Sequence, residues 1–312
     1  MGQVGDGGGR GAGRWVRRHL VVDRVLSRLV PDELQLRWRH ELVLGRTPDL
    51  RRPRTFNEKI NWLKLHWRDP RAPGCCDKLA VRGFVEARCG PEVLNELLGV
   101  HGAFDELDLA ALPDAFVLKA THGSGFNVLC PDKASFDAAA ARARFRGWMR
   151  QEFGRQDREW PYYGLPRRIV CERWLGTAGA PPEDYKLFCF DGEPRFVEVH
   201  SGRGDDHRQA MYDLDWKQLP LGLERPPPDR PAPRPAALPA LVHRARALAA
   251  GFPFVRVDLY AVEGAVVFGE LTFFPRAGLK RFADPADDLW LGGFLRLPPG
   301  PGGAGDCGGP LG

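Results

Sequence analysis

Hydrophobic and polar residues alternate in paired short runs at three places along the chain, and glycine lies between the runs of each pair. The pairs are "AFVLKA" and "FNVLC", "DYKLFCF" and "EPRFVEVH", and "FVRVDLYAV" and "AVVFGELTF". A period of two predicts strands, and the Asp191-Gly192 and Glu263-Gly264 turns predict hairpins. Three further strands are predicted within "LNELLGVHGAF", "RRIVCERWL" and "QAMYDLDWKQL".

Other segments repeat their apolar residues at helical spacing. The stretch from Trp15 to about Leu44 does so, and Thr55 followed by Glu58 forms a capping box at the start of "TFNEKINWLKLHW". Further helices are predicted in "CDKLAVRGFVEARCG", ended by Gly90, in "SFDAAAARARFRGWMRQEF", capped by Ser135, and in "LPALVHRARALAAGF". Hairpins outnumber βαβ units, which predicts an α+β fold with antiparallel sheets.

Composition is that of an ordinary globular protein. The 312 residues are 43% hydrophobic and 27% charged, with a net charge of +5. Arg14, Arg17 and Arg18 form a basic arm that fits an anionic membrane face or a solvated surface, and we expect no nucleic acid partner. The chain shows no membrane-spanning run, secretory signal or myristoylation motif, so a cytoplasmic protein is expected.

Cysteine usage points to buried, reduced thiols. The seven cysteines are an odd number, and no Cys/His cluster has zinc-binding spacing.

The glycine-bearing centre of "FVLKATHGSGFNVLC" allows two interpretations. It lacks the spacing of a Rossmann or Walker loop. It fits an ordinary hairpin, and it also fits a loop whose backbone N–H groups hold phosphate while Lys119 adds a positive charge.

A pair of acids on the last hairpin favours the second interpretation. Asp258 and Glu270 lie on opposite sides of the Glu263-Gly264 turn, so pairing brings them close together. Two carboxylates on strands suit Mg²⁺ beside nucleotide phosphates. Solvated edge-strand acids are the alternative, but the apolar neighbours make it less attractive, because a buried carboxylate needs a cation or hydrogen bonds.

The order of these features resembles the ATP-grasp superfamily, in which two α+β subdomains hold a nucleotide. The resemblance implies ATP and Mg²⁺ as cofactors. It places Lys119 on the phosphates under a lid of His122, Gly123, Ser124 and Gly125, and Glu172, Trp174 and Leu175 at the adenine hinge. It assigns Asp184 to ribose, Lys186 to phosphate or adenine, Arg256 to oxyanion stabilisation, and Asp258, Glu270 and Thr272 to metal. Thr272 stands where the superfamily usually has asparagine.

Four sequence segments resemble the TupA-like branch of that superfamily: "TFNEKINWLKLHWRDP", "DKLAVRGFV", "DYKLFCFDGEPRF" and "GELTFFPRAG". In that branch, threonine is usual at the position of Thr272. The branch implies a role in bacterial cell-surface polymer synthesis. The resulting division is an N-terminal arm and helix (1–50), a helical α/β region (51–115), a lid subdomain (116–174), a C-terminal subdomain with the metal site (175–297) and a tail (298–312).

The resemblance implies a ligase that activates a carboxylate as an acylphosphate and joins it to an amine. The carboxylate would be a small molecule or sugar-linked, and contact with the inner membrane face or polymer synthesis enzymes would fit the branch. A phosphotransferase and a non-catalytic nucleotide-binding partner stay open as alternatives. His200, Arg203 and His207 fit either an acidic-substrate site or a polar surface loop.

Overall fold

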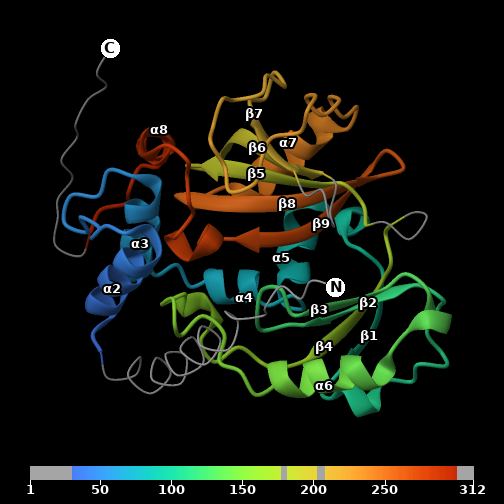
Figure 1. The fold of residues 1–312 in the computed structure, drawn as a ribbon. Helices are drawn as coiled ribbons and strands as arrows, with labels where there is room; N and C mark the ends of the chain where they lie inside the picture. Colours follow the sequence, from blue (N-terminus) through green and yellow to red (C-terminus); the bar gives the residue numbers. More distant parts are fainter. Residues whose placement is uncertain (1–29, 177–180, 202–207, 301–312) are drawn as a thin grey trace, which may run out of the picture.

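The computed structural model describes residues 30–176, 181–201 and 208–300. Its strands form two antiparallel sheets with orders β1-β4-β2-β3 and β7-β6-β5-β8-β9 (Figure 1), which confirms the α+β fold. The small-sheet strands are β1 (Leu97–His101), β2 (Phe116–Ala120), β3 (Asn127–Cys130) and β4 (Ile169–Arg173). The large-sheet strands are β5 (Asp184–Phe190), β6 (Glu193–Ser201), β7 (Arg208–Tyr212), β8 (Phe254–Val262) and β9 (Ala265–Thr272).

Both predicted tight turns of the large sheet are confirmed. Asp191 and Gly192 have φ angles of 49° and 81°, and Glu263 and Gly264 have φ angles of 50° and 84°. Two consecutive left-handed residues match the twist of the strands that they join. The turns therefore set the register of the two hairpins that carry most of the candidate site.

Seven α-helices lie in the part of the chain that the structure describes. They are α2 (Asp32–Leu44), α3 (Phe56–His66), α4 (Ala72–Cys76), α5 (Val81–Cys89), α6 (Ala138–Trp148), α7 (Leu238–Ala249) and α8 (Pro285–Phe294). The predicted capping box is present at α3, where Thr55 and Glu58 bond each other's backbone N–H. The beginning of the helix predicted from Trp15, and the basic arm before it, lie outside the described residues.

Three helix boundaries differ from the sequence prediction. The cap of α6 is Asp137 and not Ser135, because the Asp137 carboxylate accepts the Ala140 N–H at 2.9 Å. Helix α6 also ends earlier than expected, at Trp148, and α5 begins only at Val81. Helix α8 was not predicted, although capping by Asp284 and a proline at its start are ordinary helix signals.

The apolar residues form two separate clusters. The larger joins the large sheet to α3, α5 and α7 and has an aromatic centre at Phe56, Phe188 and Phe254. The smaller joins the small sheet to α6 through Phe116, Phe145 and their neighbours. Each sheet therefore has its own packed core, and polar residues are left where strands β5, β8 and β9 face away from these cores.

The thiols agree with the compositional expectation as far as the description reaches. The six cysteines within the described residues are all buried and free, with no disulfide. Among those residues, no helix combines the length and apolar character needed to cross a bilayer.

Candidate functional site

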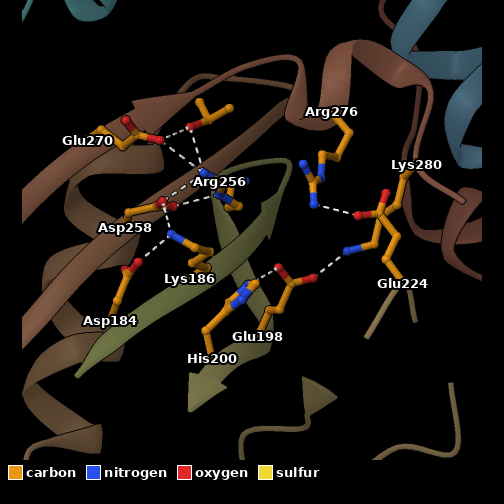
Figure 2. A network of polar contacts seen from close by, with 11 residues as sticks. Asp184, Lys186, Glu198, His200, Glu224, Arg256, Asp258, Glu270, Arg276 and Lys280 are labelled. Carbon is orange, nitrogen blue, oxygen red and sulfur yellow. Dashed lines mark hydrogen bonds and ion pairs between the residues drawn. The ribbon is translucent and has the colours of Figure 1, made fainter. Parts of the chain in front are cut away.

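A row of charged side chains crosses four neighbouring strands of the large sheet. Glu198 of β6 pairs with Lys186 of β5, Lys186 with Asp258 of β8, and Asp258 with Glu270 of β9. Residues directly opposite each other on adjacent strands point to the same face. The expected proximity of Asp258 and Glu270 is therefore confirmed, and Lys186 adjoins Asp258 (Figure 2).

Arg256 is the centre of the hydrogen bonds around these acids. Its guanidinium donates to both carboxylate oxygens of Asp258, at 2.6 and 2.7 Å. The same group donates to Glu270 at 3.0 Å and to the Thr272 hydroxyl at 3.1 Å. The three residues that the sequence assigned to a metal therefore all point their oxygen atoms at one positive group.

Lys186 holds the other side of this network. Its ammonium lies 2.6 Å from a carboxylate oxygen of Asp184 and 2.6 Å from one of Asp258. Asp184 and Asp258 are buried, whereas the Glu270 side chain is 35% exposed. Glu270 is thus the carboxylate of the pair that a ligand can reach.

A β-bulge at Gly269 decides which face Glu270 occupies. Leu259 pairs with Phe268, but the next pair is Asp258 with Glu270, so Gly269 has no partner. Uninterrupted pairing would place Gly269 opposite Asp258 and turn Glu270 to the other face. A Cβ atom at position 269 would lie 2.9 Å from the carbonyl oxygen of Asp258, so glycine is needed for this close approach.

The charges in the row shift one another's ionisation. Partial burial would raise the pKa of Glu270, but nearby cations, with Arg256 the strongest, lower it to about 2. Burial likewise raises the pKa of Asp258, while Arg256 and Lys186 oppose that shift. Burial would lower the pKa of Lys186, but Asp258, Asp184 and Glu270 together outweigh it and the pKa is raised. Glu270 is therefore ionised at neutral pH and available to a cation.

On the small sheet, Lys119 of β2 meets Glu172 of β4. The ammonium lies 2.6 Å from the Glu172 carboxylate, and the Arg82 guanidinium approaches the same carboxylate at 3.5 Å. Trp174 and Leu175 follow β4 and are half-buried. The structure thus brings Lys119 and Glu172, which are far apart in sequence, into direct contact.

The predicted glycine loop joins β2 to β3 and is held by aromatic packing. The His122 imidazole is buried, donates from Nε2 to the Trp148 carbonyl at 3.0 Å, and packs on Phe126. Gly123 is closely packed, since a Cβ there would lie 2.6 Å from the Phe126 ring. Ser124 and Gly125 are exposed, and Gly125 has a φ of 73°. The tip of the loop is therefore the part that solvent and ligands reach.

Lys78 is a site residue that the sequence analysis missed. It precedes α5, and its ammonium donates to the Gly123 carbonyl oxygen in the glycine loop. Burial lowers the pKa of Lys78, Glu270 opposes this shift and Lys119 adds to it. Lys78 is thus within electrostatic reach of acidic and basic groups on both sheets. It lies in the segment "DKLAVRGFV", whose helical pattern and family resemblance do not single out this lysine.

The family assignment agrees with this arrangement. A family model described as TupA-like ATP-grasp matches residues 58–296. This chain belongs to the TupA-like ATP-grasp family. Its matched region contains both sheets and every described residue of the two polar networks.

Solved structures similar to this TupA-like protein include three ligases. A D-alanine–D-alanine ligase from Bacillus anthracis has 17% identity and a TM-score of 0.34, covering 64% of this chain and 57% of its own. An L-amino acid ligase from Bacillus licheniformis has 12% identity and a TM-score of 0.43, covering 68% and 46%. The ATP-grasp ligase PsnB, complexed with a minimal precursor, has 10% identity and a TM-score of 0.36, covering 65% and 54%.

This chain therefore spans about half the length of the solved structures that it resembles. No curated protein matches its sequence.

The donor atoms of the TupA-like site suit Mg²⁺ only when a nucleotide completes the coordination. No group of three or more His, Cys, Asp or Glu side chains within the described ranges is arranged to hold a metal alone. Mg²⁺ in nucleotide sites is commonly bound by one or two carboxylates, substrate phosphates and water. Glu270, Asp258 and the Thr272 hydroxyl supply such oxygen atoms, so the residues fit the ion.

The residues suggested for an acidic substrate are only partly described. His200 of β6 donates a hydrogen bond from Nε2 to the Glu198 carboxylate at 2.9 Å, which ties it to the charged row. Arg203 and His207 lie outside the described residues.

Proposed function

We propose that this protein is an ATP-dependent carboxylate–amine ligase acting in bacterial cell-surface polymer synthesis. The observation that carries the proposal is the in-register pair Asp258 and Glu270, held together by Arg256 on rigid strands. A solvated edge-strand pair would have neither a buried aspartate nor a shared guanidinium. Membership of the ATP-grasp family supports ATP as the partner of these acids.

In this proposal the small sheet binds the nucleotide. Lys119 contacts the phosphates, and the exposed tip at Ser124 and Gly125 covers them with backbone N–H groups. Lys78 adds a second ammonium beside the same loop. The Glu172–Leu175 segment borders adenine. Because Lys119 is bonded to Glu172, nucleotide binding exchanges that contact for phosphate.

The large sheet supplies the remaining groups. Asp184 and Lys186 lie where ribose and a second phosphate or adenine contact are expected. Glu270, Asp258 and Thr272 would hold Mg²⁺, which would offset the charge of the phosphates when bound. Arg256 would then stabilise the oxyanion of the tetrahedral intermediate.

The chemistry needs positioning more than covalent participation by the protein. A substrate carboxylate oxygen attacks the γ-phosphorus, the bond to the β-phosphate oxygen breaks, and ADP leaves. An amine then attacks the acyl carbon, the tetrahedral intermediate loses phosphate, and the nitrogen loses a proton. Fixing the reactants in line on two rigid sheets supplies a large part of the rate enhancement.

The cellular setting is also part of the proposal. The carboxylate substrate is a small molecule or a sugar-linked acid, and the protein works in the cytoplasm. Contact with the inner membrane face or with polymer synthesis enzymes would bring it to a growing polymer.

Isotope transfer tests the proposal. The protein is incubated with ATP, Mg²⁺, amines and a panel of ¹⁸O-labelled carboxylates, and the released phosphate is analysed by mass spectrometry. A ligase transfers one ¹⁸O to phosphate, while a phosphotransferase forms ADP and a phosphorylated product without free phosphate. Lys119→Ala is the inactive control. ATP turnover that releases unlabelled phosphate with every acid in the panel would refute the ligase assignment.

A further inference from the structure

The loop that follows β9 has an unusual backbone. Arg276 and Ala277 have φ angles of 52° and 54°, and both are non-glycine residues in the left-handed region. Such conformations are disfavoured and persist only where the surroundings fix them, most often at functional sites. The loop, Pro275–Lys280, begins three residues after Thr272, so it lies next to the candidate metal ligands.

Helix α3 fixes this loop through three buried polar side chains spaced four and three residues apart, which places them on one helix face. Each binds a different backbone group of the loop. Lys64 Nζ donates to the Ala277 carbonyl at 2.5 Å, Asn61 Nδ2 to the Gly278 carbonyl at 2.8 Å, and the Asn57 amide donates to the Lys280 carbonyl and accepts the Lys280 N–H, both at 2.8 Å. Two of the segments that resemble the TupA-like branch, around residues 57–64 and 270–278, are therefore in direct contact with each other.

The loop carries two cations, Arg276 and Lys280, and Figure 2 shows each beside an acidic partner. The Lys280 ammonium is buried and bonds Glu198, which also bonds His200. The Arg276 guanidinium bonds Glu224, and its side chain is 58% exposed. Lys280 thus completes the internal network, whereas Arg276 is the loop cation that a ligand can reach.

We propose that the Pro275–Lys280 loop recognises the substrate other than ATP, and that Arg276 binds a carboxylate of that substrate. This inference rests on the proposed function and names a specificity residue for it. A guanidinium presents two parallel N–H donors that match a carboxylate. Glu224 bonds one nitrogen of this guanidinium, and the carboxylate of the substrate displaces it. Asn57, Asn61 and Lys64 are positioning residues, because they orient the loop without reaching the ligand.

Calorimetry with chosen probes tests this inference. D-glucuronate and glutarate are titrated into the full chain with ADP and Mg²⁺ present, and their uncharged counterparts, D-glucose and glutaramide, serve as reference ligands. At least one acid binds the parent protein, and its uncharged counterpart does not. Arg276→Ala weakens that binding about tenfold or more, as loss of a charge-assisted hydrogen bond implies. Glu224→Gln tightens it, because the competing carboxylate is gone.

Two further variants separate recognition from stability. Arg281→Ala removes the exposed arginine next to the loop and leaves probe affinity unchanged. Lys64→Met weakens probe binding while ADP affinity stays the same, whereas a purely structural role would leave probe affinity of the folded protein intact. The inference is overturned if neither acid binds the parent, if the uncharged probes bind equally well, or if Arg276→Ala binds the acid like the parent.

The same titrations distinguish failure of the loop assignment from failure of the ligase assignment. Arg276-dependent binding of an acid by a protein that does not bind ADP refutes the ATP-dependent function and leaves the loop assignment standing. ATP turnover with ¹⁸O transfer, but acid binding indifferent to Arg276, refutes the loop assignment alone.

Discussion

The two acids of β8 and β9 are expected to respond differently to neutralisation. Asp258→Asn removes a buried carboxylate that accepts three charge-assisted hydrogen bonds from Arg256 and Lys186. Glu270→Gln removes a carboxylate that is 35% exposed and accepts one guanidinium hydrogen bond. The first substitution therefore disturbs the fold, and the second mainly disturbs the site.

The magnitudes follow from burial. Breaking a buried ion pair by removing one partner costs about 3–5 kcal/mol. Because Asp184 and Glu270 still compensate part of the positive charge, we expect about 3 kcal/mol for Asp258→Asn. The Glu270 ion pair is screened by solvent, and its loss costs about 1 kcal/mol or less. In a domain of this size the first value lowers the melting temperature by about 6–12 °C.

Thermal unfolding and ATP turnover, measured on the same samples, check this contrast. Glu270→Gln should melt within about 4 °C of the parent yet lose turnover about a hundredfold or more, as removal of an electrostatic catalytic group does. Equal destabilisation by the two substitutions would refute the burial argument. Parental turnover by Glu270→Gln would remove Glu270 from the site.

Four further outcomes are expected. Lys119→Ala weakens ATP binding and abolishes turnover with the fold intact, as titration and circular dichroism would show; unchanged affinity would remove Lys119 from the site. Hydrogen exchange in residues 122–127 slows when an ATP analogue binds, and equal protection would favour a plain hairpin. Gly269→Ala lowers stability by about 1–3 kcal/mol in urea unfolding, because the new methyl overpacks the bulge; no change would contradict the close approach. Since the folded pKa of Glu270 is about 2, below the ordinary 4.5, its stabilising contribution is present above pH 4.5 and disappears as the pH falls toward 2. Urea unfolding of parent and Glu270→Gln should therefore converge at low pH.

The hairpins were predictable because strand alternation and the turn residues Asp191-Gly192 and Glu263-Gly264 give the same answer locally. The proximity of Asp258 and Glu270 followed from that register to within one residue. The bulge at Gly269 did not follow, because a single unpaired residue leaves no periodic signal in the sequence.

Other parts of the site depend on tertiary contacts that periodicity does not reveal. Asn57, Asn61 and Lys64 look like the solvated face of a helix, but in the structure that face is buried against the Pro275–Lys280 loop. Lys78 falls within a predicted helix, and its contact with Gly123 depends on the tertiary approach of that segment to the β2–β3 loop.

Because of the bulge, the number of residues between Asp258 and Glu270 determines how the two acids can pair. Lengthening both strands by one residue at the Glu263-Gly264 turn keeps Asp258 opposite Glu270, so the outer arm is free to grow or shrink in steps of two residues. Deleting Gly269 removes the bulge, but Glu270 then follows Phe268 directly into the position opposite Asp258, so both acids keep their shared face beside Arg256. The number of residues between the two acids therefore shows whether a bulge is needed to pair them, which the identity of the acids alone does not. In a related chain with the same two-residue turn, an even number of residues between the acids pairs them without a bulge, whereas an odd number, as in this chain, requires one.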